Sequence, residues 1–173
     1  MRVFLCSYAG FSVAIPMNSV ASLILYKNTA EKTIEYDSKN SNTYISLPVL
    51  LRDRQSVIRH GIILKNGHND ETEDMFKNKT ILLSTEVECE EEIPAENIYP
   101  VPKVFSVFDF SVIFNGISFN SGKASGPGSD VLLHAESLSL SPPAEVKHII
   151  LFLNPEEFLN NIEARLHSIR SAA

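Results

Sequence analysis

The sequence predicts a mainly β protein that ends in a helix. Short runs rich in Val, Ile, Tyr, Phe and Thr recur along the chain, and clusters of Gly, Pro, Asn and Ser separate them. A clear helical spacing of apolar residues begins only near residue 155. The 173 residues are 44% hydrophobic and 21% charged, which suits one domain, or two small subdomains that share a core. We therefore expect a mostly-β barrel or sandwich with a terminal helix.

Residues 2–16 predict a β-hairpin, because two runs of strand formers flank a turn at Gly10. The apolar run at 21–26 (ASLILY) follows it. This run predicts either a third strand or a short helix capped by Asn18 or Ser19, and the pattern leaves both open. In the helical alternative one face would be apolar: Val20, Leu23 and Ile24.

The middle of the chain alternates between polar loops and strands. Residues 27–43 are polar, and we expect a loop there. The chain then re-enters the core at 44–51, where Pro48 marks an edge or the end of a strand. Residues 57–64 (VIRHGIIL) predict a strand, and a second polar loop opens with the turn-forming pair Asn66-Gly67.

The stretch from Lys79 to Phe119 holds the densest strand signal. Thr80 to Ser84 predicts a strand, and residues 85–90 (TEVECE) alternate with period two. This alternation predicts that Val87 and Cys89 face the core while three carboxylates face water: Glu86, Glu88 and Glu90.

The second half of this stretch predicts a turn and an extended connection. A turn is expected at Pro94 to Glu96, and Pro100 and Pro102 hold the following chain extended. Residues 105–108 suggest a packed segment. The strand expected at Val112 to Phe119 contains Asn115-Gly116, a turn or bulge signal.

The last third of the chain ends in the predicted helix. Residues 120–128 (NSGKASGPG) have a loop composition, and strand-like runs follow at 131–140 and 148–153. Asn154 is a helix cap, Pro155 suits the first helical position, and the acidic residues that follow favour the first turn. The helix is expected at about 155–170, with one apolar stripe along it: Phe158, Leu159, Ile162, Leu166 and Ile169.

Composition excludes several functional classes. A net charge of −6 argues against a nucleic-acid surface. No apolar run is long enough for direct membrane insertion by a helix. Cys6 and Cys89 are too few for a disulfide scaffold and suit a reducing compartment, so we expect a cytoplasmic protein. An extracytoplasmic β-domain is the alternative, and it would need cleavage of the loosely signal-like N-terminus.

Motifs for catalysis or metal binding are not evident in the sequence. A phosphate-loop interpretation fails because five residues separate Gly116 from Gly122 and Ala124 replaces the Ser or Thr that would meet magnesium. The five histidines share no metal-ligand spacing, and no serine lies in a nucleophile elbow. We expect no enzyme, cofactor or metal. The alternative is a small β-barrel enzyme that uses the acidic strand at 86–92 with a nearby histidine.

The order of five segments along the chain carries more information than any single motif. They are FLCSYAGFSVAIPMNSVASLI (4–24), LPVLL (47–51), TILLSTEVECEEEIPAENIYPVPKVF (80–105), FNGISF (114–119) and HIILFLNPEEFL (148–159). In this order they resemble CheW-like domains, the coupling proteins of bacterial chemotaxis. The resemblance implies a single domain over 1–173, built from two small five-stranded SH3-like β-barrels that share a core, with a C-terminal helix. Residues 120–147 would then be an insertion before the last strand.

The resemblance also implies a function. CheW-like domains are non-enzymatic adaptors that couple the chemoreceptor signalling domain to the regulatory domain of a CheA-type histidine kinase through β-edges and an apolar groove. The implied partner-binding residues are Val20, Ser22, Leu23, Thr43, Tyr44 and Gly116. Val20 and Gly116 match the family pattern.

The sequence also departs from that pattern. The Leu-Arg-Gly of the family falls near Asn42-Thr43-Tyr44, its Asp after the proline falls at Leu51, and a common Glu falls near Ser22. These departures affect the receptor-facing positions rather than the fold.

Overall fold

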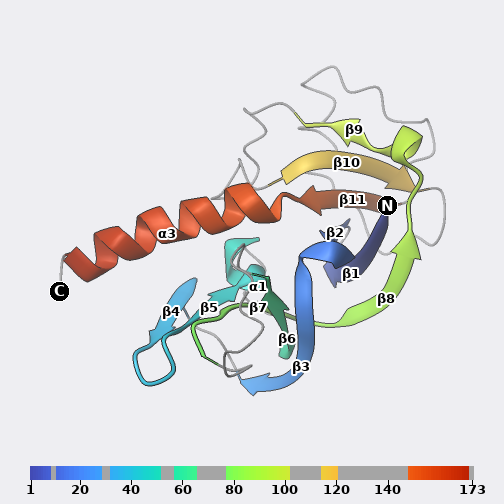
Figure 1. Cartoon of the computed structure of the whole chain (residues 1–173). Coiled ribbons are helices and arrows are strands. Elements are labelled where there is room, and N and C mark those ends of the chain that lie inside the picture. Colours follow the sequence, from blue (N-terminus) through green and yellow to red (C-terminus); the bar gives the residue numbers. More distant parts are fainter. Residues whose placement is uncertain are drawn as a thin grey trace.

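The fold consists of two β-sheets and a long C-terminal helix, α3 (Pro155–Ser171) (Figure 1). The computed structural model describes residues 1–8, 11–28, 32–51, 57–65, 77–101, 114–120 and 148–171. Several predictions lie outside these residues: the turn at Asn66-Gly67, Pro102, the segments 105–108 and 131–140, and the proposed insertion beyond Asn120.

The first sheet has six strands in the order β8-β1-β2-β11-β10-β9. The predicted hairpin is confirmed, since β1 and β2 pair antiparallel with Val3 opposite Pro16. Strand β11 lies parallel to β2, with Leu151 opposite Val13, so the last strand of the chain closes onto the first hairpin. The strands are β1 (Arg2–Tyr8), β2 (Phe11–Pro16), β8 (Val87–Glu92), β9 (Tyr99–Pro100), β10 (Phe114–Asn120) and β11 (His148–Leu153).

The second sheet has five strands in the order β3-β6-β7-β5-β4. Its strands are β3 (Val20–Asn28), β4 (Ile34–Asp37), β5 (Asn42–Ser46), β6 (Ile58–Leu64) and β7 (Thr80–Ser84). The helical alternative for 18–24 is wrong: a 3-10 turn, η1 (Met17–Ser19), leads directly into β3, which pairs with β6 from Val20 onward. The loop predicted at 27–43 is wrong in part, because Glu35 pairs with Tyr44 in the β4–β5 ladder.

The stretch from Thr80 to Glu92 crosses from one sheet to the other. The strand predicted at Thr80 to Ser84 is β7 of the second sheet, and the alternating run that follows it leads into β8 of the first sheet. The register of the ladder between β8 and β1 shifts, with Val87 opposite Cys6 and Cys89 opposite Leu5. Val87 packs against the core, and Glu86 and Glu88 are exposed, as predicted. The side chains of Cys89 and Glu90 lie outside the described part of the structure.

The bulge predicted at Asn115-Gly116 is confirmed. The register between β10 and β11 shifts between Phe114 and Gly116, so Asn115 has no directly opposed residue. The turn predicted at Pro94 to Glu96 is the 3-10 turn η2 (Ala95–Asn97). Strand β9 then pairs Pro100 with Gly116, which places the extended proline segment at the edge of the six-stranded sheet.

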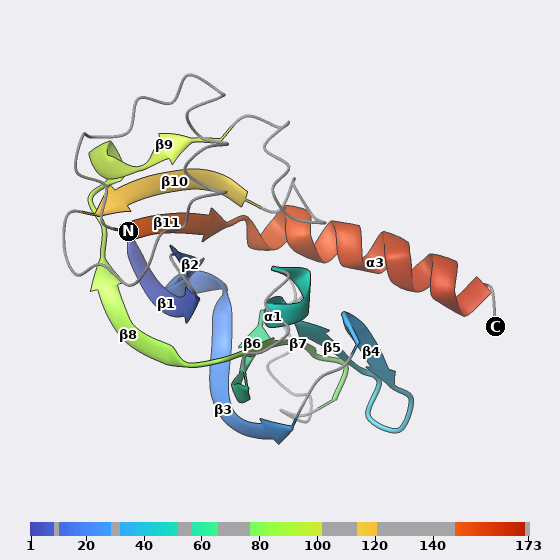
Figure 2. The same cartoon turned by 180° about the vertical axis from the view of Figure 1, so that it is seen from behind.

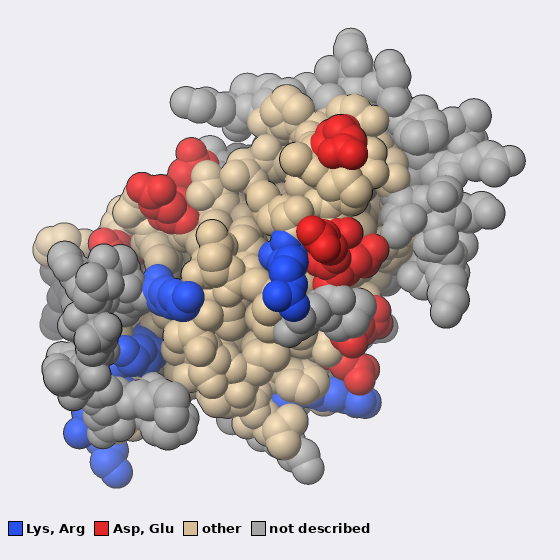
Figure 3. All heavy atoms as spheres, turned by 45° about the vertical axis from the view of Figure 1, so that its right-hand side comes forward, with Lys and Arg blue, Asp and Glu red and all other residues tan. Residues whose placement is uncertain are grey.

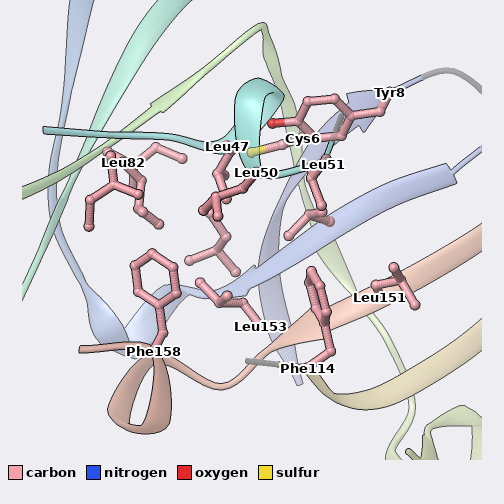
Figure 4. Close-up of a cluster of buried hydrophobic side chains, with 14 of the residues drawn as sticks. Cys6, Tyr8, Leu47, Leu50, Leu51, Leu82, Phe114, Leu151, Leu153 and Phe158 are labelled. Atoms are coloured by element: carbon pink, nitrogen blue, oxygen red, sulfur yellow. The ribbon is translucent and has the colours of Figure 1, made fainter. Parts of the chain in front are cut away.

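Three apolar clusters explain how the two sheets are held together. The largest lies between them and draws on both sheets, on α3 and on the short helix α1 (Leu47–Leu50) (Figure 4). Each sheet also buries a smaller cluster on its other face: one around Val3, Ala14 and Phe152, and one around Ile63 and Ile81. The resemblance implied a shared core, and the structure adds a smaller core on the other face of each sheet.

Helix α3 begins as predicted. The Oδ1 atom of Asn154 accepts a hydrogen bond from the backbone N–H of Glu157 at 3.3 Å, the geometry of a helix N-cap. Phe158, Ile162 and Leu166 are buried in the shared core. Their spacing of four residues puts them on one face, which packs across the core.

The predicted fold class is confirmed: the protein is mainly β, with two sheets and a C-terminal helix. The described strands form open, curved sheets of six and five strands rather than two closed five-stranded barrels (Figure 2). Strands β3 and β4 are the edges of the smaller sheet.

Candidate partner-binding surface

Strand β3 carries three of the predicted binding residues and forms an open edge. It pairs with β6 on one side, and no other strand in the described ranges pairs with its second side. Val20 and Ser22 are half-buried, whereas the side chain of Leu23 is 40% exposed. Leu25, which the sequence interpretation missed, is 82% exposed. An open edge with exposed apolar side chains is typical of strand-mediated association.

The close approach of β3 to β6 depends on Gly61. Ile24 lies opposite Gly61, and a Cβ atom at Gly61 would lie 2.8 Å from the Cγ1 atom of Ile24. The absence of a side chain therefore lets Ile24 lie over β6. Leu23 and Leu25 point to the opposite face from Ile24. They lie opposite Ile62 and His60 in the register.

Thr43 and Tyr44 lie in the same sheet as β3, but they face opposite sides of it. Tyr44 faces the smaller core of this sheet, where its ring centroid lies 5.8 Å from that of Tyr26 on β3. Thr43 is buried, and its N–H donates a hydrogen bond to the carbonyl of Lys79 at 2.8 Å. The fold therefore connects Tyr44 with β3 through Tyr26, whereas Thr43 belongs to another face.

Gly116 lies away from β3, in the six-stranded sheet. A Cβ atom at this position would lie 2.7 Å from the Cγ2 atom of Ile98 and 3.4 Å from the Cβ atom of Phe152. Gly116 is thus required for close packing between β10 and the Ile98 segment. The structure does not bring it together with the other predicted residues.

A groove of about 920 Å³ lies at the junction of the two sheets, next to the start of β3. It is bordered by the start of β1, η1, the end of β6 and the start of α3. The hydroxyl of Ser19 donates to the carbonyl of Pro16 at 2.6 Å, and the N–H of Lys65 donates to the carbonyl of Ser19 at 2.9 Å. These bonds fix the turn that forms the floor. The lining combines apolar and charged groups: Met1, Arg2, Pro16, Met17, Asn18, Ser19, Lys65, Asn154, Pro155, Glu156 and Leu159.

A second groove of about 670 Å³ lies between α3 and the end of the five-stranded sheet. Thr43 lines it together with Lys79 from the sheet side, and Glu163 and His167 line it from the helix. Sequence interpretation missed the lining of both grooves except for Thr43. The residues come from segments more than 100 positions apart, and no local pattern links them.

The arrangement of two sheets, shared core and terminal helix has a counterpart among solved structures. The chain is similar to the crystal structure of the scaffolding protein TtCheW from Thermoanaerobacter tengcongensis, with a TM-score of 0.50 and 15% sequence identity, over 88% of this chain and 83% of that chain. The chain has a CheW-like fold. No protein-family model and no curated protein sequence matches it.

Within this CheW-like fold, carboxylates gather on the face that carries β8 (Figure 3). Glu86, Glu88, Glu92 and Glu96 are exposed. The Nη1 atom of Arg59 lies 3.9 Å from the Oε2 atom of Glu86, an exposed pair that contributes little to stability. The enzyme alternative required Glu86, Glu88 or Glu90 in a cleft with a histidine or a metal. Glu86 and Glu88 are exposed, and the side chain of Glu90 lies outside the described part of the structure. In the described part of the chain, no group of three or more His, Cys, Asp or Glu side chains is placed to hold a metal.

One histidine and one cysteine have shifted pKa values. The Nε2 atom of His148 lies 2.7 Å from the hydroxyl oxygen of buried Ser12. Burial lowers the pKa of His148, an effect that Glu88 and Glu91 oppose. Burial raises the pKa of the Cys6 thiol to about 11, which keeps it protonated and unreactive at neutral pH. Ser12 is 1% exposed, so the Ser12–His148 pair does not present a nucleophile at the surface.

None of the helices in the described residues is long and apolar enough to cross a bilayer.

Proposed function

We propose that this protein is a divergent, non-enzymatic chemotaxis adaptor that works as a scaffold in the cytoplasm. Its fold is similar to that of a CheW scaffolding protein, and this is the single observation that carries the proposal. The adaptor would bind the signalling domain of a chemoreceptor and the regulatory domain of a CheA-type histidine kinase.

The binding surfaces in this proposal are the β3 edge and the junction groove. The free side of β3 offers backbone donors and acceptors to an extended partner segment, and Leu23 and Leu25 offer apolar contact area. Ser19 lines the groove and directly precedes β3, so one partner could contact both surfaces. Val20 and Ser22 would contribute at the boundary between the two.

Two departures from the family pattern, at Asn42-Thr43-Tyr44 and at Ser22, lie in the same sheet. Thr43 and Tyr44 occupy the place of the receptor-facing Arg and Gly, and they are a buried and a half-buried residue here. We therefore propose that the receptor contact relies more on the β3 edge and the groove than on the Thr43 position. An enzymatic function has no supporting observation of comparable weight.

Pairwise binding measurements test this proposal. Calorimetric titration of the chain with each isolated partner domain should give saturable binding in the micromolar range, roughly −8 kcal/mol. Leu25→Lys should weaken binding to at least one partner. Tyr99→Lys is the matched control, because Tyr99 is a 46% exposed aromatic residue in the other sheet. Absence of binding to both domains at high micromolar concentration would exclude coupling.

A further inference from the structure

We propose that β3 also pairs with β3 of a second copy of this chain, as an antiparallel two-fold dimer. This inference stands apart from the chemotaxis role, since it rests only on the edge strand itself. The evidence is the free side of β3, the exposure of two leucines on it, and the order of its residues.

The free side of β3 determines the kind of partner. Among the described strands, only β6 pairs with β3, and no described strand bonds to the backbone N–H and C=O groups on its other side. Figures 1 and 2 show β3 as a long strand along the margin of its sheet. The partner that fits such an edge is another extended strand.

The residue order of β3 favours its own copy as that strand. The segment Leu23-Ile24-Leu25 is symmetric about Ile24. Antiparallel pairing with the two-fold axis at Ile24 places Leu23 opposite Leu25 of the second copy, and Ile24 opposite its equivalent. Side chains directly opposite in an antiparallel pair lie on the same face, so four leucines would form one apolar row.

Burial of the exposed leucine side chains would favour the association of two copies. Leu25 is 82% exposed and Leu23 is 40% exposed in the single chain. Both project to the same face, because they are two residues apart in a strand. Pairing would remove these side chains from water, which favours association.

The absence of charged side chains permits close approach of two copies at this edge. Each copy has a net charge of −6, and two copies repel each other at long range. Residues 20–26 contain no charged side chain, so the paired segments place no like charges opposite each other. The acidic surface over β8 belongs to the other sheet.

The register shifts in β3 limit the length of the paired segment. They occur between Val20 and Ser22 and between Leu25 and Asn28, and they bracket the regular stretch that contains Ile24. A short paired segment predicts a weak dimer rather than an obligate one. A two-fold interface is closed, so the expected product is a dimer and not a filament. Dimer formation would also occupy the edge that the proposed partners use.

Sedimentation velocity of the full chain over a roughly hundredfold range of concentration tests the dimer. The sedimentation coefficient should rise with concentration toward that of a dimer. Leu25→Lys should weaken the association by about tenfold or more, and Tyr99→Lys should leave it unchanged. A wild-type chain that stays monomeric throughout would overturn the proposal, as would an equal loss in both variants.

Mixing two variants tests the pairing register. The test compares dimer formation in the mixture with that of each variant alone, so it does not depend on how much either variant weakens the wild-type dimer. Leu23→Glu and Leu25→Lys should each dimerise poorly alone. In an equimolar mixture, the new Lys lies opposite the new Glu and the second pair remains leucine on leucine, so mixed dimers should form more strongly than either homodimer. Circular dichroism of each variant confirms that it is folded. A mixture that associates no better than its components would overturn the register.

Discussion

The rings of Tyr26 and Tyr44 lie with their centroids 5.8 Å apart, although β6 and β7 separate their strands. Three steps across a flat sheet would span about 14 Å between backbones. The two side chains therefore reach toward each other over the intervening strands and cover the smaller core around Ile63 and Ile81. The contact ties the β3 edge to β5, which carries two further predicted binding residues, Thr43 and Tyr44.

This tyrosine contact should be measurable as a coupling energy. Tyr26→Ala and Tyr44→Ala should each lower the free energy of unfolding, and the double variant should lose less than the sum. The expected difference is about 0.5–1.5 kcal/mol, the range for aromatic pairs. Urea unfolding of the four proteins in the cycle gives this value. Strict additivity would mean that the rings do not interact.

The packing at Gly116 predicts a second interaction. Gly116→Ala should destabilise the protein by about 1–3 kcal/mol, because the added methyl group would lie 2.7 Å from the Cγ2 atom of Ile98. Ile98→Ala removes that methyl group, so Gly116→Ala should cost much less in an Ile98→Ala background. Thermal unfolding of the three variants tests this prediction. An equal cost in both backgrounds would indicate that Ile98 is not the obstacle.

Stability should depend on pH through His148. Burial lowers the pKa of this side chain below its ordinary value of 6.5, so the unfolded chain takes up the proton at higher pH than the folded chain. The free energy of unfolding should therefore decrease as pH falls through about 6.5, until the folded form is also protonated. His148→Gln should flatten this part of the curve, measured by urea unfolding between about pH 5 and pH 8. If the free energy of unfolding of His148→Gln has the same slope against pH as that of the wild type, other groups cause the pH dependence.

The start of helix α3 predicts a cap energy. Asn154→Ala removes the side-chain acceptor for the N–H of Glu157 and should cost about 1 kcal/mol. Asn160→Ala is the matched control, because Asn160 is exposed within the same helix, where alanine favours helix formation. Thermal unfolding should show a lower Tm only for the cap variant. An equal change of Tm in both variants would indicate that the cap hydrogen bond does not itself stabilise the helix.

Local signals in the sequence were sufficient to predict part of this fold. The hairpin around Gly10, the strand at Thr80 to Ser84 and the cap at Asn154 all depend on residues within a few positions of each other. The bulge at Gly116 was also evident, because Asn-Gly within a strand pattern is a local signal. These features were predicted correctly for that reason.

Features that depend on distant pairing could not be predicted in the same way. The run at 21–26 suited a helix or a strand, and only pairing with β6 decides between them. Strand β4 reads IEYD, which is too polar to distinguish from a loop without its ladder to β5. The groove unites Arg2, Lys65 and Glu156, which no sequence spacing connects.

A bridging assay shows whether this chain couples the two proposed partners. Vesicles that carry the chemoreceptor signalling domain are sedimented with the kinase regulatory domain, with and without this protein. We expect the kinase domain to enter the pellet only when the chain is present, and less so with Leu25→Lys than with Tyr99→Lys. Sedimentation of the kinase domain to the same extent without the chain, or in neither case, would exclude coupling by this protein.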